Sequence, residues 1–494
     1  MNDRHPAASL PTAPAHRKLG PVERFLRLFT DIRSGEGATA LLLTLNVFLI
    51  FVAYSIMKVL REVLVLSTSG VERKALSSAG QAVVLLAVVP LYGAIASRVP
   101  RRRLINIVTG FFVACLGVFY ALYVLDIAIG IAFYIWLGIF SVMVVAQFWA
   151  FANDVYTTDE GKRLFPIVGF GSASGAVAGA WVTGVLQHAV GIGVALLIAA
   201  GLLLLGVVVT NIVDRGERRR TETHLPDIHT SGTMPAATGQ VRAATGEFRV
   251  PSEEYRQESG AFRAISTTQE IATAEPLQST GGAFVLVWRN RYLLLMAVLV
   301  LLLNWVNTSG EFILSAFVKD VAQRAAASGA ATEAEVYGRF YSGFQGTVNL
   351  VGMLLQLFVV SRVIKYLKIP AALLILPLVS FAAYSLMAFV PVLLAVRWAK
   401  TAENGSDYSL NNTVRQALFL PTTREEKYKA KQVVDSFAQR AGDLLASLTY
   451  LGGTVVLGLA YTHLALVNLL LVAVWLAIAV LIGRRYRRLD ALAG

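Results

Sequence analysis

The chain has 494 residues and a formal net charge of +13; 56% of its residues are hydrophobic and only 15% are Asp, Glu, Lys or Arg. In soluble domains roughly a quarter of the residues are charged. Apolar runs of about twenty residues, the length that a helix needs to cross the hydrocarbon core, recur along the chain. The composition excludes a soluble protein and predicts an all-α, polytopic membrane protein.

The apolar runs fall into two sets of six, twelve transmembrane helices in all. The first six predicted spans lie near 37–62, 75–97, 104–125, 127–152, 165–187 and 191–213, and the second six near 291–317, 339–361, 369–388, 390–412, 432–458 and 463–483. We therefore expect an N-terminal segment at 1–36, a six-helix half at 37–213, a linker that is disordered by its composition at 214–290, a second six-helix half at 291–483 and a tail at 484–494.

Lysine and arginine predict the orientation, because they are enriched in cytoplasmic loops. They follow every second span, at Arg101, Lys162, Arg215, Lys365, Lys427 and Arg484 among others. Both termini and the linker are therefore expected in the cytoplasm, with the protein in the cell inner (plasma) membrane. We expect no cleaved signal peptide, since the first 36 residues contain no apolar run. The same placement accounts for the basic charge without nucleic-acid binding.

Two short motifs repeat in register between the halves. TTDEGK at 157–162 follows the fourth span, and TTREEK at 422–427 follows the tenth. SRVPRRRL after the second span and SRVIKYLK after the eighth repeat the same way. Two six-helix halves related by an axis along the membrane normal predict a major-facilitator-like architecture, with the substrate site between the halves.

The first span carries charged side chains, each of which costs roughly 2.5–3.5 kcal/mol to place inside a membrane-spanning helix. Tyr54, Lys58, Arg61 and Glu62 share one face of the predicted helix, so Glu62 is expected to pair with Lys58. The functional interpretation is an anion site. The alternative is that these side chains reach the membrane edge near the end of the span.

Four later spans also carry polar residues. The seventh has Trp305 and Glu311, and Glu311 has no basic residue within a turn, so we expect its partner to be Lys58 or Arg61. The eighth has Tyr341, and the eleventh has Arg440 and Asp443. The tenth places a polar stripe along one helix face, which we expect to line a cavity rather than to pack on another polar helix: Arg397, Lys400, Asn404, Asp407 and Asn411.

Other patterns favour simple interpretations. Gly171, Gly175 and Gly179 are spaced by four residues, which indicates close helix packing rather than a phosphate loop. No G-x-x-x-x-G-K-[ST] motif occurs. The six histidines show no metal-ligand spacing, and the lone Cys115 can form no intrachain disulfide. We expect no enzyme activity, no cofactor and no metal.

Several segments resemble the ATP/ADP antiporter family, the nucleotide transporters of plastids and intracellular bacteria. They are FWAFANDVYTTDEGKRLFPIVGFG at 148–171, DYSLNNTVRQALFLP at 407–421 with the following KAKQVVDSFAQRAG, and KVLREVLVL at 58–66. The resemblance implies that Lys58, Arg61 and Arg415 handle the phosphates and that Glu311 couples the exchange. Guanidinium and ammonium groups suit phosphate through permanent charge and forked donors.

The chain departs from this family at several positions. The glutamate of the family's fourth helix aligns with Leu137 or Gly138 and is absent. The lysine of its eleventh helix aligns with Asp443, which reverses the charge, and Asn412 stands where the family has aspartate. The substrate match is therefore incomplete.

The leading functional prediction is an alternating-access transporter that exchanges nucleotides of the ATP/ADP type or a similar phosphorylated anion. Tyr54, Trp305, Tyr341 or Tyr408 would stack a base. The expected substrate-binding residues are Lys58, Arg61, Glu311, Arg415, Tyr54, Lys400, Asp407, Tyr408, Asn412, Arg440, Trp305 and Tyr341. One alternative is a carrier for another organic anion, coupled to protons through Glu311 or Asp443.

A second alternative is a membrane scaffold or sensor that does not transport. The linker favours it, because a Thr/Ser-Gly-x-apolar-Arg phrase occurs three times, as TGQVR, TGEFR and SGAFR. This phrase is either a motif that docks a cytoplasmic partner or is phosphorylated, or it is low-complexity drift in an unconstrained tether.

Overall fold

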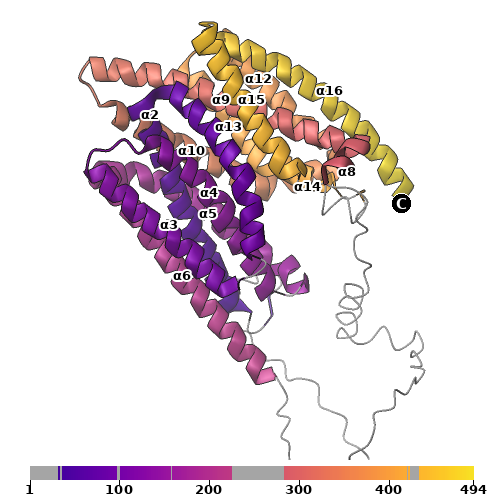
Figure 1. Cartoon of the computed structure of the whole chain (residues 1–494). Helices are drawn as coiled ribbons and strands as arrows, with labels where there is room; N and C mark the ends of the chain where they lie inside the picture. Colours follow the sequence, from indigo (N-terminus) through magenta and orange to yellow (C-terminus); the bar gives the residue numbers. More distant parts are fainter. Residues whose placement is uncertain are drawn as a thin grey trace, which may run out of the picture.

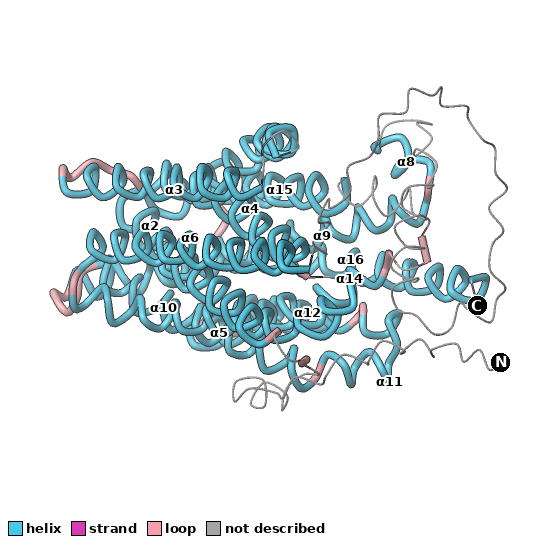
Figure 2. Tube along the Cα trace, turned by 90° about the horizontal axis from the view of Figure 1, so that it is seen from below, coloured by secondary structure: helices cyan, strands magenta, loops and turns pink. Residues whose placement is uncertain are grey.

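The computed structural model describes residues 32–33, 36–96, 99, 101–156, 158–224, 283–419, 421–422 and 433–493. All secondary structure in this part of the chain is helical. Figure 2 shows long helices joined by short loops throughout it. The prediction of an all-α fold is confirmed.

The first half contains five long helices: α2 (Gly37–Ala96), α3 (Arg101–Val124), α4 (Gly130–Val155), α5 (Thr158–Ala189) and α6 (Gly191–His224). α2 covers both of the first two predicted spans, because it turns back on itself at Gly70, whose φ of 74° is readily adopted only by glycine. We call this end of the bundle the Gly70 end.

The second half is more broken. Its elements are α8 (Ala283–Arg289), α9 (Arg291–Ala327), α10 (Glu333–Phe358), α11 (Val360–Ala372), α12 (Ile375–Phe389), α13 (Leu393–Ser406), η2 (Asp407–Asn411), α14 (Asn412–Ala417), η4 (Val433–Ala438), α15 (Gln439–Leu451), η5 (Gly452–Val456) and α16 (Tyr461–Ala493). Asn290 caps α9 by accepting from the amides of Tyr292 and Leu293. Thr332 and Glu335 form a reciprocal capping box at α10.

Seven helices of the described part are long and apolar enough to cross a membrane, or eight with the bent pair α10 and α11. This number is below twelve for three reasons. α2 counts once although it doubles back, α12 is short, and π-helical turns divide the tenth and eleventh predicted spans into shorter pieces. The two-half, polytopic architecture is retained.

Several helices extend beyond the predicted boundaries. α6 continues to His224 and α16 to Ala493, while α8 occupies part of the expected linker. The segment expected as a loop after the eighth span forms α11, bent by 76° from α10. Most of the expected N-terminal segment 1–36, namely residues 1–31 and 34–35, and the linker residues 225–282, with the threefold phrase, lie outside the described residues.

Each half has its own hydrophobic core. One buried cluster is drawn from residues between Ile32 and Val213 alone. The other is built mainly from residues after Val287, with additions from α2 and α4 such as Val63 and Tyr134. Figure 1 shows α3 to α6 grouped on one side of the molecule, and α12, α15 and α16 on the other.

The glycine stripe of α5 packs against α2, as predicted. A Cβ atom added at Gly171, Gly175 or Gly179 would lie 2.5–2.6 Å from a carbonyl oxygen of α2. The oxygens belong to Thr44, Phe48 and Val52. Small residues therefore let the two backbones approach closely, as in other membrane bundles.

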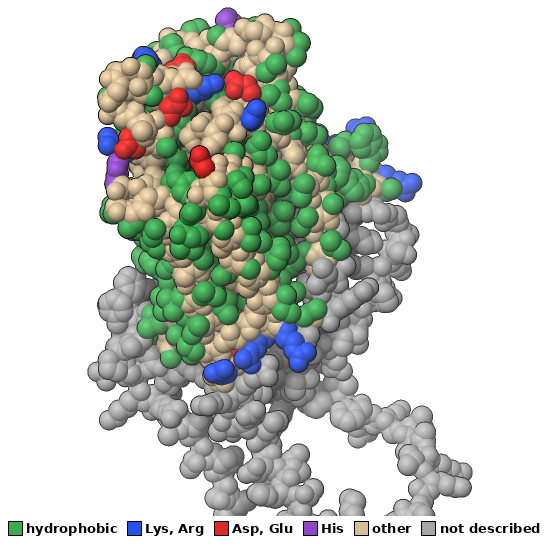
Figure 3. All heavy atoms as spheres, turned by 60° about the vertical axis from the view of Figure 1, so that its left-hand side comes forward, with side chains coloured by type: hydrophobic (Ala, Val, Ile, Leu, Met, Phe, Trp, Pro, Cys, Tyr) green, Lys and Arg blue, Asp and Glu red, His purple; other side chains and the backbone are tan. Residues whose placement is uncertain are grey.

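The surface is that of a membrane protein. Figure 3 shows a broad apolar face, with Lys and Arg side chains gathered below it and acidic and basic side chains mixed above it. Exposed large apolar residues occur on helices of both halves, including Val185 on α5 and Leu470 on α16. A bilayer would cover such a face.

Candidate functional site

A polar cavity of about 280 Å³ lies between the two halves. We call it the central cavity. It is lined by Lys58, Arg61, Glu62, Lys74, Ser78 and Gln81 of α2, Tyr134 of α4, Asn304, Asn307, Thr308, Glu311 and Phe312 of α9, Tyr341, Phe344 and Gln345 of α10, Asp407 and Tyr408 of η2, and Gln439, Arg440 and Asp443 of α15. Both halves contribute to it, as the repeated architecture predicts.

The first cluster of the cavity joins two cations to one carboxylate. Arg61 donates to Glu62 through Nε at 3.1 Å and Nη2 at 2.5 Å, and its guanidinium lies over the ring of Tyr134. Glu62 also pairs with Lys74 at 2.6 Å. Since Lys58 does not pair with Glu62, the expected pairing within α2 is wrong: Lys74, on the returning arm of α2, takes its place.

Lys74 also joins the two halves. Its side chain is 2% exposed and donates to Ser315 of α9 at 2.7 Å, while Ser315 shares a hydrogen bond of 2.9 Å with Tyr341. The sequence placed Lys74 in an outer loop, so its role was missed. The available signal was the distance of Lys74 from Gly70. Lys74 comes four residues after the turn at Gly70, where α2 is helical again.

A second cluster surrounds Lys400, whose side chain is fully buried. Lys400 lies 2.7 Å from Glu403 and 3.7 Å from Glu311, and it donates to Asn307 at 2.8 Å. Glu311 also accepts from Asn404 at 2.8 Å. The expected partners of Glu311, Lys58 and Arg61, are therefore replaced by Lys400.

The reason is geometric. Lys400 and Asn404 lie one turn apart on α13, which packs beside α9, so they reach Glu311 from the same half of the protein. Glu403 was not singled out from the sequence. Its spacing of three residues from Lys400 places both side chains on one helix face and was the available signal.

A third cluster lies on α15 and α9. Arg440 pairs with Asp443 at 2.9 Å, and Thr308 donates to the same carboxylate at 2.8 Å. Asp443 thus lies in the cavity wall, at the position where the resembling family has lysine. Its charge is balanced within one turn of its own helix.

Lys58 has a different environment. Its ammonium group donates to the hydroxyl of Tyr408 at 3.3 Å and lies 5.4 Å from the centre of that ring. Among the described residues, no carboxylate oxygen lies within 4 Å of Lys58 Nζ. Lys58 is therefore a cation of the cavity that is open to an anionic ligand.

The polar stripe of the tenth span does not line the cavity along its whole length. Only Asp407 of the stripe does so, together with its neighbour Tyr408. Lys400, Asn404 and Asn411 are buried behind the wall. The π-helical turn η2 changes the helical register at this point, so one straight stripe cannot continue along one face.

Four other predicted residues lie away from the cavity. Tyr54 stacks on Phe140 in the N-terminal half. Trp305 donates to Thr449 at 3.0 Å. Asn412 is exposed, and Arg415 of α14 is not among the residues that line the cavity, although its charge acts on Asp407.

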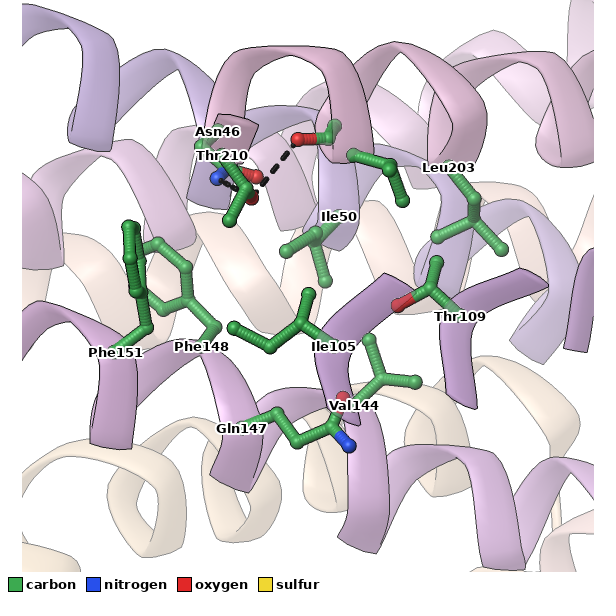
Figure 4. A pocket seen from close by; sticks show the side chains of 12 residues that line it. Asn46, Ile50, Ile105, Thr109, Val144, Gln147, Phe148, Phe151, Leu203 and Thr210 are labelled. Atoms are coloured by element: carbon green, nitrogen blue, oxygen red, sulfur yellow. Dashed lines mark hydrogen bonds between the residues drawn. The ribbon is translucent and has the colours of Figure 1, made fainter. Parts of the chain in front are cut away.

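Two further cavities contain none of the predicted residues. One, of about 20 Å³, lies within the N-terminal half. Figure 4 shows Asn46 donating to Thr210 on one side of it, with Gln147 on the opposite side. This cavity is far smaller than small-molecule sites, which are roughly 300–1,000 Å³. The other, of about 640 Å³, is a groove between α11 and α16 that includes Lys368 and Arg487.

Comparisons with known proteins agree with this architecture. The family model of the TLC ATP/ADP transporters matches residues 130–213, which form α4 to α6. ADP,ATP carrier protein 1 of Chlamydia pneumoniae is 24% identical over 246 residues, which cover 44% of this chain and 45% of the relative. The match thus spans less than half of that relative's length.

Solved transporter structures share the fold. A bacterial homolog of the human lysosomal transporter Spinster aligns over 92% of this chain and 98% of its own, with a TM-score of 0.55. The nucleoside transporter NupG aligns over 92% and 99%, also at 0.55, and the POT family transporter PepTSo over 91% and 98%, at 0.58. Because each is 12% identical, these structures show the fold alone.

The resemblance to the ATP/ADP antiporter family is therefore confirmed by sequence, and the major-facilitator-like prediction by fold. The chain is a multi-pass membrane protein of the transporter class that resembles the ATP/ADP antiporters.

Proposed function

We propose that the protein exchanges nucleotides, or a similar phosphorylated anion, across the inner membrane by alternating access. The observation that carries this proposal is Lys58, a cavity cation with a tyrosine and no carboxylate as its described partner. The similarity to ATP/ADP transporters supports nucleotides as the ligand class. The position of the cavity between the halves supports alternating access.

In the proposed mechanism, phosphate binds first to Lys58 and then to Arg61. Arg61 can turn from Glu62 to the ligand because Lys74 still balances that carboxylate at 2.6 Å. Tyr134, Tyr341 and Tyr408 supply aromatic surface for a base. Binding thus draws α2 of one half toward η2 of the other, and the halves rock about the occupied cavity.

Counterflow in proteoliposomes tests this proposal. Proteoliposomes loaded with unlabelled ADP should take up labelled ATP, ADP or AMP from outside. Lys58→Gln and Arg61→Ala should each reduce nucleotide binding about tenfold or more, since each removes a charged hydrogen bond worth roughly 1.5–3 kcal/mol. The matched control is Lys365→Gln on α11, outside the cavity wall.

Two results would contradict the proposal. One is binding and counterflow at the parental level in both Lys58→Gln and Arg61→Ala, which would show that α2 is not part of the binding site. The other is no binding of any nucleotide to purified, folded wild-type protein. The second result would favour the scaffold or sensor alternative.

A second candidate function is a proton-coupled carrier of an organic anion. The observation that favours it is the sharing of Lys400 by two carboxylates, Glu403 at 2.7 Å and Glu311 at 3.7 Å. One lysine cannot balance both carboxylates, so one of them can take up a proton, and Glu311 is the one that lines the cavity. An inward proton gradient should then drive uptake without internal substrate, and Glu311→Gln should abolish this drive while leaving counterflow intact.

A further inference from the structure

The central cavity is balanced in charge. Its cations are Lys58, Arg61, Lys74 and Arg440, and its carboxylates are Glu62, Glu311, Asp407 and Asp443, four against four. A site built for a triphosphate would be expected to hold a clear surplus of cations, because uncompensated charge at this depth is costly. The lining therefore suits a ligand that carries fewer negative charges than a triphosphate.

The ion pairs leave two of these groups open. Lys74 and Arg61 share Glu62, Arg440 pairs with Asp443, and Glu311 lies near Lys400. Among the described residues, Lys58 donates to Tyr408, and Asp407 accepts from the amide of Asn411 at 2.7 Å. The charges of Arg415 and Lys400 act on Asp407 from beyond ion-pair distance. Within the described residues, no Lys or Arg nitrogen lies within 4 Å of Asp407.

The two open groups belong to different halves of the protein. Lys58 is on α2, and Asp407 is the first residue of η2. Tyr408 follows Asp407 and reaches Lys58 at 3.3 Å, which brings η2 to α2 across the cavity. A ligand that binds both groups would contact both halves at once.

We propose that the substrate is bipolar: one phosphate binds at Lys58 and Arg61, and an amino group at the other end donates to Asp407. A nucleoside monophosphate with an amino-bearing base, which is adenine, cytosine or guanine, has this chemistry. Its phosphate carries about two negative charges at neutral pH, and Asp accepts from the exocyclic amino group of a base. This inference rests on the proposed function and narrows its substrate class.

The size of the cavity agrees with a small nucleotide. Its volume of about 280 Å³ is at the lower end of ligand sites, roughly 300–1,000 Å³. Each added phosphate would bring further negative charge next to Glu62, Glu311 or Asp443. Affinity should therefore fall from AMP to ADP to ATP.

Binding to purified protein by calorimetry tests the charge argument. Adenosine, AMP, ADP and ATP would be compared at one pH and salt concentration. We expect AMP to bind tightest, with ATP and adenosine each weaker by about tenfold or more. Tighter binding of ATP than of AMP would overturn the inference while leaving the proposed function in place.

AMP and IMP test the role of Asp407, because they differ by an amino group against a carbonyl oxygen at one ring position. Wild-type protein should prefer AMP by about tenfold or more, and Asp407→Asn should reduce this preference to about twofold or less. Asp320→Asn, which alters a carboxylate of α9 outside the cavity, is the matched control. Retained AMP binding by Asp407→Asn would show that the variant is folded.

The failures can be told apart. Equal binding of AMP and IMP to the wild type, or an unchanged preference in Asp407→Asn, overturns the bipolar substrate alone. No binding of any member of the adenosine series overturns both this inference and the proposed function. If Asp407→Asn fails to fold, Asp407→Glu, which retains the carboxylate, must keep the preference for AMP.

Discussion

Lys400 is a fully buried charge behind the wall of the central cavity. Its three polar neighbours Glu403, Asn307 and Glu311 come from two helices, α13 and α9. Ser380 and Tyr384 donate to Glu403 at 3.0 and 3.4 Å. A buried ion pair contributes little compared with apolar packing, but removing one partner leaves an uncompensated charge.

This asymmetry yields a prediction for the pair. Lys400→Met should lower the free energy of unfolding by about 3–5 kcal/mol, because Glu403 and Glu311 then lack their cation. The double variant Lys400→Met with Glu403→Gln should recover part of this loss. Chemical unfolding in mixed micelles measures the free energies, and equal stability of the single and double variants would contradict the coupling.

Glu36 lies just before α2 and links it to α5. Arg163 pairs with Glu36 at 2.8 Å, and the backbone amide of Arg33 donates to the same side chain at 2.8 Å. Burial raises the pKa of Glu36, but the hydrogen bonds and charge of Arg163 outweigh it, so the pKa lies below its ordinary value. The pair therefore stabilises the folded state above the ordinary carboxyl pKa and loses this effect as the pH falls through the lowered pKa.

A pH series with Glu36→Gln checks this statement. At pH 7 the variant should unfold at a lower temperature than the parent. The difference should shrink toward zero in acid, once Glu36 of the parent is protonated. A difference that is constant from pH 7 to pH 3 would mean that the carboxylate charge contributes nothing.

At the level of elements, η2 sets the shape of the site. Its π-helical turn spans Asp407–Asn411, between α13 and α14. The wider turn rotates α14 relative to the continuation of a straight α-helix, and such turns occur frequently at functional sites. It presents Asp407 and Tyr408 to the cavity while Asn411 stays buried.

The contact of α5 with α2 yields a second element-scale prediction. Gly175→Ala would place a Cβ atom 2.5 Å from the carbonyl oxygen of Phe48, so the helices must separate. We expect a loss of about 1–3 kcal/mol of stability, the range for overpacking. Gly169→Ala on the same helix is the matched control, because nothing lies within 4 Å of its added Cβ. Equal stability of the two variants would show that the close approach is not required.

At the scale of the whole molecule, described contacts join the halves at the Gly70 end. Lys74 donates to Ser315 at 2.7 Å, and Glu72 pairs with Lys319 at 3.6 Å. Arg339 of α10 reaches His188 near the end of α5 at 3.2 Å. Alternating access requires that such contacts break and re-form during each cycle.

Crosslinking at this end tests that requirement. In a Cys115→Ser background, Glu72→Cys and Lys319→Cys would be joined by a short, cleavable dithiol reagent. We expect the crosslink to reduce counterflow to background with nucleotide binding retained, and reduction of the reagent to restore it.

The control pair is Arg324→Cys with Ser328→Cys, since both residues lie at the end of α9 in one half. Crosslinking there should leave counterflow unchanged. Full counterflow with the Glu72–Lys319 crosslink complete would show that the Gly70 end does not open during transport.

The sequence alone was enough to predict the all-helical, two-half membrane fold, the packing of the glycine stripe and the polar character of α2, α9, α13 and α15. These follow from local rules: span length, the helical period and the cost of charge in lipid. The partners of each charge were decided by tertiary structure. Glu62 pairs with Lys74, and Glu311 lies near Lys400. The Gly70 turn and the packing of α13 on α9 bring these side chains together, and their spacing along a single helix does not predict it.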